Sequence, residues 1–212
     1  MSIICPTITA LNTHQYRDQV ERVESFARII HVDIMDGVFV KTQSPGIAQI
    51  WWPKNLQAHL HLMVDNPLHI IKHAIALNPE MIIVHAEADM GEVIEVLMRL
   101  KHTKIKSGLA ILSETDPDAD DIFGMLSMAD HALVFSGHLG YQGGKANMDD
   151  IKKVKKIHQN FPDISIGWDG GINDENIIKL KNAGVDYFNV GGYIQKSENP
   201  TERFNQLSQL IK

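Results

Sequence analysis

The chain has 212 residues, 44% of them hydrophobic and 22% charged, and its 20 Lys and Arg against 26 Asp and Glu give a formal net charge of −6. A chain of this kind can bury a large core in one domain or two small ones. Its single cysteine excludes an internal disulfide framework, and its acidity argues against nonspecific binding to nucleic acid or anionic membranes. No apolar run approaches the roughly 20 residues of a membrane span and no basic leader precedes Pro6, so we expect a cytoplasmic protein that binds neither nucleic acid nor membrane.

Short β-branched runs alternate with longer segments of helical spacing. We expect strands at residues 3–5, 29–35, 58–64, 81–85, 106–112, 132–135, 164–169 and 187–190. The first helix is indicated by Tyr16, Val20, Val23 and Ala27, which recur at steps of three and four residues. No linker rich in Pro, Gly or Ser divides the chain, so we expect the pattern to form one domain.

Two helices towards the C-terminus have recognisable ends. One is expected to run from residue 173 or 174 to Gly184, because glycine favours the position that follows a helix. The other has Asn199 as its N-cap and Pro200 at its first position. We expect the Glu202 side chain to reach back to the backbone of this cap.

Strands that alternate with helices predict parallel βαβ units. Eight units in 212 residues leave about 26 residues for each, which is compact but within the lower range of a (β/α)8 barrel, usually ~200 to 250 residues long. A doubly wound open sheet is the rival, but no G-x-G-x-x-G follows the first strand. We therefore predict a (β/α)8 TIM barrel that forms a single domain over residues 1–212.

Successive side chains of a strand point to opposite faces, and two predicted strands separate by chemical type accordingly. In the second strand the aliphatic residues share one face, whereas His31, Asp33 and Met35 share the other. In the seventh strand Asp169 lies opposite the apolar face. Because aliphatic residues belong beneath the helices of a barrel, we expect these polar side chains to face the lumen.

The third predicted strand repeats this arrangement with His59, His61 and Met63 on one face. Burying such polar groups unpaired in a lumen would cost several kcal/mol each. A single buried histidine is ordinarily satisfied by its neighbours. Groups of ligand type and equal parity on three strands instead favour a metal site.

Four of these side chains form the predicted ligand set: His31, Asp33, His61 and Asp169. His31 and Asp33 stand two residues apart on one strand, so both can bind one ion. Two imidazoles and two carboxylates suit Zn, Fe, Mn or Co better than Mg or Ca. We therefore expect one divalent metal ion as cofactor.

The sequence also carries motifs in the order known from one enzyme family. Residues 31–40 (HVDIMDGVFV) resemble the signature H-[VIL]-D-[VI]-M-D-G-x-F-V of the ribulose-phosphate 3-epimerase family. Residues 61–64 resemble its second ligand strand, 84–87 the end of its fourth strand, and 169–172 its late D-G-G motif. The first motif is highly specific, whereas D-G-G alone would be a weak signal.

The resemblance implies an active site at the carboxyl ends of the strands and a divalent metal held by His31, Asp33, His61 and Asp169. It implies that Asp33 and Asp169 are the acid/base groups on the two faces of a ketose phosphate, which is inverted at C3. D-ribulose 5-phosphate, converted to D-xylulose 5-phosphate, is the favoured substrate. Members of the family are often homodimers or homohexamers, so we expect a homo-oligomer.

Phosphate binding is assigned to backbone N–H groups in turns after the late strands. The candidates are three glycine pairs: Gly143 and Gly144, Gly170 and Gly171, and Gly191 and Gly192. A tight strand-to-helix turn is the alternative for each pair. Thr7 stands where the family has Ser and is expected to contact substrate, together with Met35 and Met63 as an apolar wall.

Several positions depart from the family pattern. Lys41 and Thr42 replace the usual Pro-Asn, Phe135 replaces a third methionine, and His59 stands where many members have Asp. Residues 139–144 replace the usual P-G-F-G-G loop. We expect these positions to line the pocket, which makes a 3-epimerase of a different ketose phosphate, such as a hexulose 6-phosphate, the alternative.

Two further alternatives remain open at this point. A phosphate-binding barrel that performs decarboxylation or aldol chemistry uses a D-x-K-x-x-D cluster, which this sequence lacks. A catalytically inactive sugar-phosphate-binding barrel would not need all four ligands. Their retention argues against it, because unpaired carboxylates in a lumen are costly.

Overall fold

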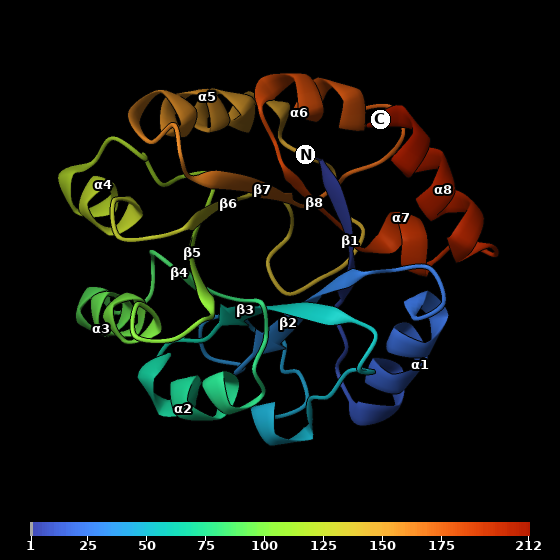
Figure 1. The fold of residues 1–212 in the computed structure, drawn as a ribbon, viewed down its shortest axis with the longest axis horizontal. Helices are drawn as coiled ribbons and strands as arrows, with labels where there is room; N and C mark the ends of the chain where they lie inside the picture. The colour runs from blue at the N-terminus through green and yellow to red at the C-terminus, as the bar shows by residue number, and fades with distance from the viewer. Residues whose placement is uncertain (1) are drawn as a thin grey trace.

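The computed structural model describes residues 2–212, which form a closed barrel of parallel strands surrounded by helices (Figure 1). In chain order the strands are β1 (Ile3–Ile8), β2 (Ile29–Met35), β3 (Gln57–Met63), β4 (Met81–His85), β5 (Lys106–Ile111), β6 (His131–Phe135), β7 (Ser165–Asp169) and β8 (Tyr187–Val190). Each strand pairs with the next, and β8 pairs with β1 to close the ring. The (β/α)8 barrel predicted from the sequence is confirmed.

Helices ring the outside of the barrel (Figure 1). They are α1 (Thr13–Val23), α2 (Leu68–Ala76), α3 (Met90–Leu100), α4 (Asp120–Leu126), α5 (Ile151–Asn160), α6 (Ile177–Ala183), α7 (Gly192–Gln195) and α8 (Pro200–Leu210), with 3-10 turns η1 (Ile47–Gln49) and η2 (Met148–Asp150). Between β2 and β3 the connection carries only η1. Across residues 2–212 no helix combines the length and hydrophobicity that a bilayer span requires.

Strand alternation decides which side chains reach the helices and which fill the lumen. Leu60 and Trp168 point outward and are fully buried in the main core, together with helix residues such as Val96. The opposite faces of the strands supply a separate apolar cluster in the lumen: Met81, Ile83, Ala110 and Leu133. The lumen is thus a packed core, and the polar side chains at its two ends need hydrogen-bond partners or other polar partners.

The last helix begins where the sequence predicts. Asn199 Oδ1 accepts a hydrogen bond of 3.1 Å from the backbone N–H of Glu202, and Pro200 is the first helical residue. The N–H of Asn199, however, donates to Ser197 Oγ at 3.1 Å rather than to the Glu202 carboxylate. The predicted reciprocal contact is therefore wrong, because a nearer hydroxyl satisfies the cap.

Helix α6 ends as predicted but begins later. Gly184 follows it with φ = 107°, the left-handed conformation that glycine adopts at no steric cost. The helix begins at Ile177, not at residue 173 or 174. Asn173 first forms a turn in which its N–H donates to Asn176 Oδ1 at 3.0 Å, so the chain enters the helix three or four residues later than predicted.

The strand bounds differ from the prediction by one residue at most, except in β1. This strand continues past the predicted residues 3–5 to Ile8, and Pro6 pairs with Val190 of β8. Proline lacks a backbone donor, but its fixed φ is compatible with an extended strand. The longer strand carries Thr7 to the carboxyl end of the barrel.

Candidate metal centre and active site

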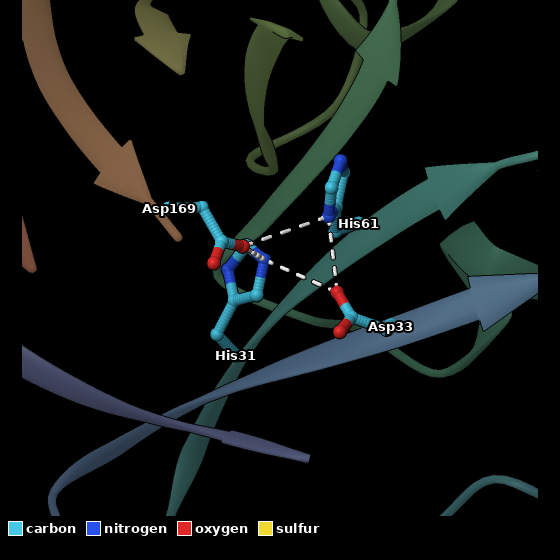
Figure 2. Close-up of side chains that lie close together, drawn as sticks. All are labelled: His31, Asp33, His61 and Asp169. Atoms are coloured by element: carbon cyan, nitrogen blue, oxygen red, sulfur yellow. Dashed lines mark hydrogen bonds and ion pairs between the residues drawn. The ribbon is translucent and has the colours of Figure 1, made fainter. Parts of the chain in front are cut away.

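The predicted ligands meet at the carboxyl end of the lumen, where Figure 2 shows all four side chains pointing toward one another. His31 and Asp33 come from β2, His61 from β3 and Asp169 from the end of β7. The parallel register places Asp33 directly beside His61. Three strands, β2, β3 and β7, thus supply one cluster, although β7 is distant from the other two in the sequence.

The four side chains are close enough to share one ion. His61 Nδ1 lies 3.0 Å from Asp33 Oδ1, and His31 Nε2 lies 3.2 Å from Asp169 Oδ2. The cross contacts are 3.5 Å from His31 Nε2 to Asp33 Oδ1 and 3.9 Å from His61 Nδ1 to Asp169 Oδ2. One ligand atom from each residue lies within 4.8 Å of the others.

This donor set fits a divalent cation. Among the residues that the structure describes, both ring nitrogens of His31 and Oδ2 of Asp169 are buried without a hydrogen-bond partner. Leaving a buried polar group unsatisfied costs about 1–3 kcal/mol. A cation that accepts lone pairs from His31 and Asp169 would remove much of that cost.

The electrostatics of the cluster set charged carboxylates against buried imidazoles. Burial lowers the pKa of His61 to about 4. Burial would also lower the pKa of His31, but the adjacent Asp169 and Asp33 carboxylates raise it above its ordinary value. Burial would raise the pKa of Asp33, but the adjacent His61 and His31 rings and a hydrogen bond from Thr9 hold it below its usual range.

Thr9 is a contact of the site that the sequence analysis missed. Its hydroxyl donates to Asp33 Oδ2 at 2.6 Å, so both oxygens of this carboxylate are engaged. Thr9 follows β1 by one residue and has the same parity as Thr7. Extending the first strand through Pro6 would have predicted that both hydroxyls point into the lumen.

His85 and Glu87 were also missed as site residues. His85 Nε2 lies 2.9 Å from His61 Nε2, and His85 Nδ1 lies 3.1 Å from Glu87 Oε2. Hydrogen bonds hold the pKa of Glu87 below its usual range, although burial would raise it. The available signal was parity, because His85 shares the lumen face of β4 with Met81 and Ile83.

A cavity of about 190 Å³ opens beside the ligand cluster. Its walls include Asp33, Asp169, the divergent Phe135 and eight of the nine positions assigned to substrate or phosphate, namely Thr7, Met63, Gly143, Gly144, Gly170, Gly171, Gly191 and Gly192. Met35 is the exception. It packs against Met63 and Val40 instead, and Thr42 Oγ1 lies 3.2 Å from its sulfur.

The glycine pairs occupy different surroundings. Gly170 and Gly171 have φ of 110° and 67°, and a Cβ at Gly171 would lie 2.0 Å from the backbone nitrogen of Ala146. Turn geometry and close packing therefore explain why this pair is glycine. Gly192 faces Gly143 across the cavity wall, where a Cβ would meet Gly143 Cα at 3.3 Å.

The loop after β6 crosses the mouth of the barrel (Figure 1, gold). Thr42 Oγ1 donates to Gly140 O at 3.1 Å, and the amide of Gln142 donates to Thr7 O at 3.3 Å. These contacts fasten residues 137–144 over the ligand cluster. Thr42 thus contributes to the pocket through the loop that it holds.

Four of the divergent positions, Lys41, Thr42, His59 and Leu139, do not line this cavity, contrary to expectation. Lys41 is exposed on the loop after β2, outside the cavity wall. His59 stands two residues before His61 on β3, roughly 6.6 Å deeper along the strand. Its ring packs edge-on against Tyr187 at 5.3 Å, at the amino end of the barrel.

Comparison with known proteins shows similarity to one enzyme family. The model of the "Ribulose-phosphate 3 epimerase family" matches residues 3–195. Relatives named ribulose-phosphate 3-epimerase include one from Helicobacter pylori, 28% identical over 92% of both chains, and one from Aquifex aeolicus, 27% identical over 100% of this chain and 97% of the relative. A solved 3-hexulose-6-phosphate synthase superposes with a TM-score of 0.76 over 99% of this chain and all of that one. Its 15% identity supports the shared fold alone.

Proposed function

The chain belongs to the ribulose-phosphate 3-epimerase family, and on this premise we propose that it is a metal-dependent isomerase that inverts C3 of a ketose phosphate. The observation that carries the proposal is the pairing of Asp33 and Asp169 with two imidazoles beside one cavity. Inversion requires one acid/base group on each face of the reacting carbon. Two carboxylates on separate strands of the ring, β2 and β7, with β1 and β8 between them, can satisfy this requirement.

His31, Asp33, His61 and Asp169 would hold the divalent ion, which is Zn, Fe, Mn or Co by donor type. When bound, such an ion supplies a Lewis acid that stabilises negative charge on the oxygens of the substrate. Burial largely excludes water from these side chains, since all four are at most 11% exposed. Electrostatic stabilisation is stronger in such an environment than in bulk water.

Proton transfer is assigned to Asp33 and Asp169. One carboxylate removes the proton at C3 and leaves an enediolate, and the other returns a proton to the opposite face. A positioned general acid or base contributes about 10²–10⁴-fold to the rate. The Thr9 hydroxyl orients the Asp33 carboxylate by its bond to Oδ2, so the other oxygen of this carboxylate stays directed into the cluster.

The phosphate of the substrate is assigned to the glycine pairs on the cavity wall, above all Gly191 and Gly192 with Gly143 and Gly144. D-ribulose 5-phosphate is the leading substrate, and the relatives' names support it. The divergent Phe135 and the loop that Thr42 fastens favour testing larger ketose phosphates, including a hexulose 6-phosphate. The homodimer or homohexamer stays a prediction.

A single experiment tests the proposal. The zinc- or manganese-loaded protein is incubated with a panel of ketose phosphates in heavy water, and deuterium at C3 is followed by NMR. Exchange with inversion is the expected result. Carbon–carbon bond cleavage would instead indicate decarboxylase or aldolase chemistry, and binding without exchange would indicate a catalytically inactive sugar-phosphate-binding barrel.

A further inference from the structure

A chain of buried contacts leads from the ligand cluster to a carboxylate outside it. His61 Nδ1 faces Asp33 Oδ1 at 3.0 Å, while its Nε2 lies 2.9 Å from His85 Nε2. His85 Nδ1 in turn lies 3.1 Å from Glu87 Oε2. Both histidine side chains are fully buried, so these contacts are not exchanged for water.

The chemistry of the groups gives this chain a direction. An ionised carboxylate only accepts hydrogen bonds, so Glu87 requires a proton on His85 Nδ1. A neutral imidazole has one N–H, which leaves His85 Nε2 as an acceptor. The proton between the two rings then belongs to His61 Nε2, and His61 Nδ1 is left with a free lone pair.

We propose that Glu87 and His85 are positioning residues that fix His61 in the tautomer able to bind a divalent cation through Nδ1. Neither touches the reacting atoms of a substrate in this assignment. Outer partners of this kind hold ligand histidines in many metal sites, and their loss typically costs 10–100-fold in metal affinity. The inference rests on the proposed metal centre but not on the proposed reaction.

The orientation of Glu87 is itself fixed. Its other oxygen, Oε1, accepts a hydrogen bond of 2.8 Å from the backbone N–H of Leu112 and another from the hydroxyl of Thr115. Two donors therefore face this oxygen from the segment that follows β5. An amide nitrogen could not take its place, because it would meet those donors without a lone pair.

This arrangement makes Glu87→Gln a directional test at nearly constant volume. The amide oxygen must face Leu112 and Thr115, so the amide NH₂ faces His85 Nδ1 and donates to it. His85 then carries its proton on Nε2, His61 accepts at Nε2, and His61 Nδ1 becomes N–H. The substitution reverses the whole chain and removes the lone pair from the ligand position.

Zinc titration by calorimetry compares the wild type with E87Q and two controls. We expect zinc to bind E87Q 10–100-fold more weakly. T115V removes one donor but keeps the carboxylate, so its affinity should stay within about threefold of the wild type by the same reasoning. E95Q makes the same chemical change in an exposed ion pair with Arg99 and should bind zinc as the wild type does.

Long-range ¹H–¹⁵N correlation of the histidine rings reads the tautomers without any turnover. Zinc-loaded wild type should carry the His85 proton on Nδ1, and zinc-free E87Q should carry it on Nε2. Wild-type zinc affinity in E87Q, or a His85 proton on Nε2 in the zinc-loaded wild type, would overturn the inference. A wild type that binds no zinc would overturn the metal centre with it, whereas failure of epimerisation alone would leave this result standing.

Discussion

The two ends of the barrel lumen use the same residue type for different purposes. At the carboxyl end His31 and His61 lie against two carboxylates within 4.8 Å of one another. At the amino end His59 and His131 are equally buried, but each packs edge-on against Tyr187, with ring centroids 5.3 and 5.4 Å apart. One end gathers ligands, and the other is packed with aromatic rings.

The side chains that contact the histidines explain why one end gathers candidate metal ligands and the other does not. His131 Nδ1 lies 2.9 Å from Ser165 Oγ, and the carboxylate beside His59 is that of Glu80, 3.9 Å away. Burial lowers the pKa of His131 to about 3 and that of His59 well below its ordinary value. These rings are therefore neutral packing groups. Strand parity places a histidine in the lumen, but neighbouring carboxylates are what make it a candidate ligand.

The largest expected contrast between the two ends concerns catalysis. Asp33→Asn and Asp169→Asn should each lower the rate of epimerisation by at least about 10³-fold, because each removes an acid/base group and a metal ligand. His59→Gln, at the amino end, should keep kcat/KM within about threefold of the wild type. Steady-state kinetics with the best ketose phosphate measures these rates. Near wild-type turnover in either asparagine variant would refute the assignment of Asp33 and Asp169 as acid/base groups.

Adding and removing metal should change the stability of the protein through the carboxyl end only. Zinc that binds only the folded protein should raise the free energy of unfolding by about 2.7 kcal/mol at a hundredfold excess over its Kd. A chelator should reverse this gain in the wild type and in His59→Gln. Asp169→Asn should show little response to either reagent in thermal unfolding. An equal zinc response in Asp169→Asn would place the ion elsewhere.

Part of the pH dependence of stability is expected to arise at the amino end. The pKa of His131 falls from 6.5 to about 3 because of burial and the nearby His31 and Lys106 charges, so below pH 6.5 the unfolded chain binds a proton that the folded chain does not. Stability is full above pH 6.5 and falls as the pH drops toward 3, with a loss of about 2.7 kcal/mol by pH 4.5 from this group.

Chemical unfolding of the chelated protein between pH 7 and 4.5 measures that slope without contributions from a bound metal. His131→Gln should flatten it by roughly 1 kcal/mol per pH unit. An unchanged slope in this variant would mean that His131 titrates in the folded barrel as it does in the unfolded chain.

The sequence predicts the barrel and the ligand set because both depend on local periodicity. The alternation of His31 and Asp33 with aliphatic residues is visible in a single strand, and the closed sheet confirms the face that they share. Thr9 was missed because the predicted first strand ends at Cys5, before Pro6. Its contact with Asp33 depends on pairing across the sheet.

Other features of the site are set by contacts that periodicity does not encode. Glu87 lies beyond the end of β4, and its direction is fixed by Leu112 and Thr115, 25 and 28 residues further along the chain. The loop that crosses the barrel mouth is held by Thr42, 98 residues from Gly140. His59 was assigned to the pocket from an aligned position, but depth along the strand removes it from the site.

The smallest contrast compares a glycine from each end. Gly191 lies on the cavity wall, where a Cβ would meet the flexible Gln142 side chain at 3.3 Å. Gly191→Val should therefore leave the fold intact but crowd the phosphate, which we expect to raise KM about tenfold, or about 1.4 kcal/mol of binding. In the amino half a Cβ at Gly167 would lie 2.6 Å from His131 Nε2, so Gly167→Ala should lower stability by about 1–3 kcal/mol through overpacking while KM stays unchanged.

Inorganic phosphate should inhibit the wild type competitively and Gly191→Val more weakly. An unchanged KM and unchanged phosphate inhibition in Gly191→Val would remove this turn from the substrate site and leave the chemistry of Asp33 and Asp169 as the distinguishing feature of the carboxyl end.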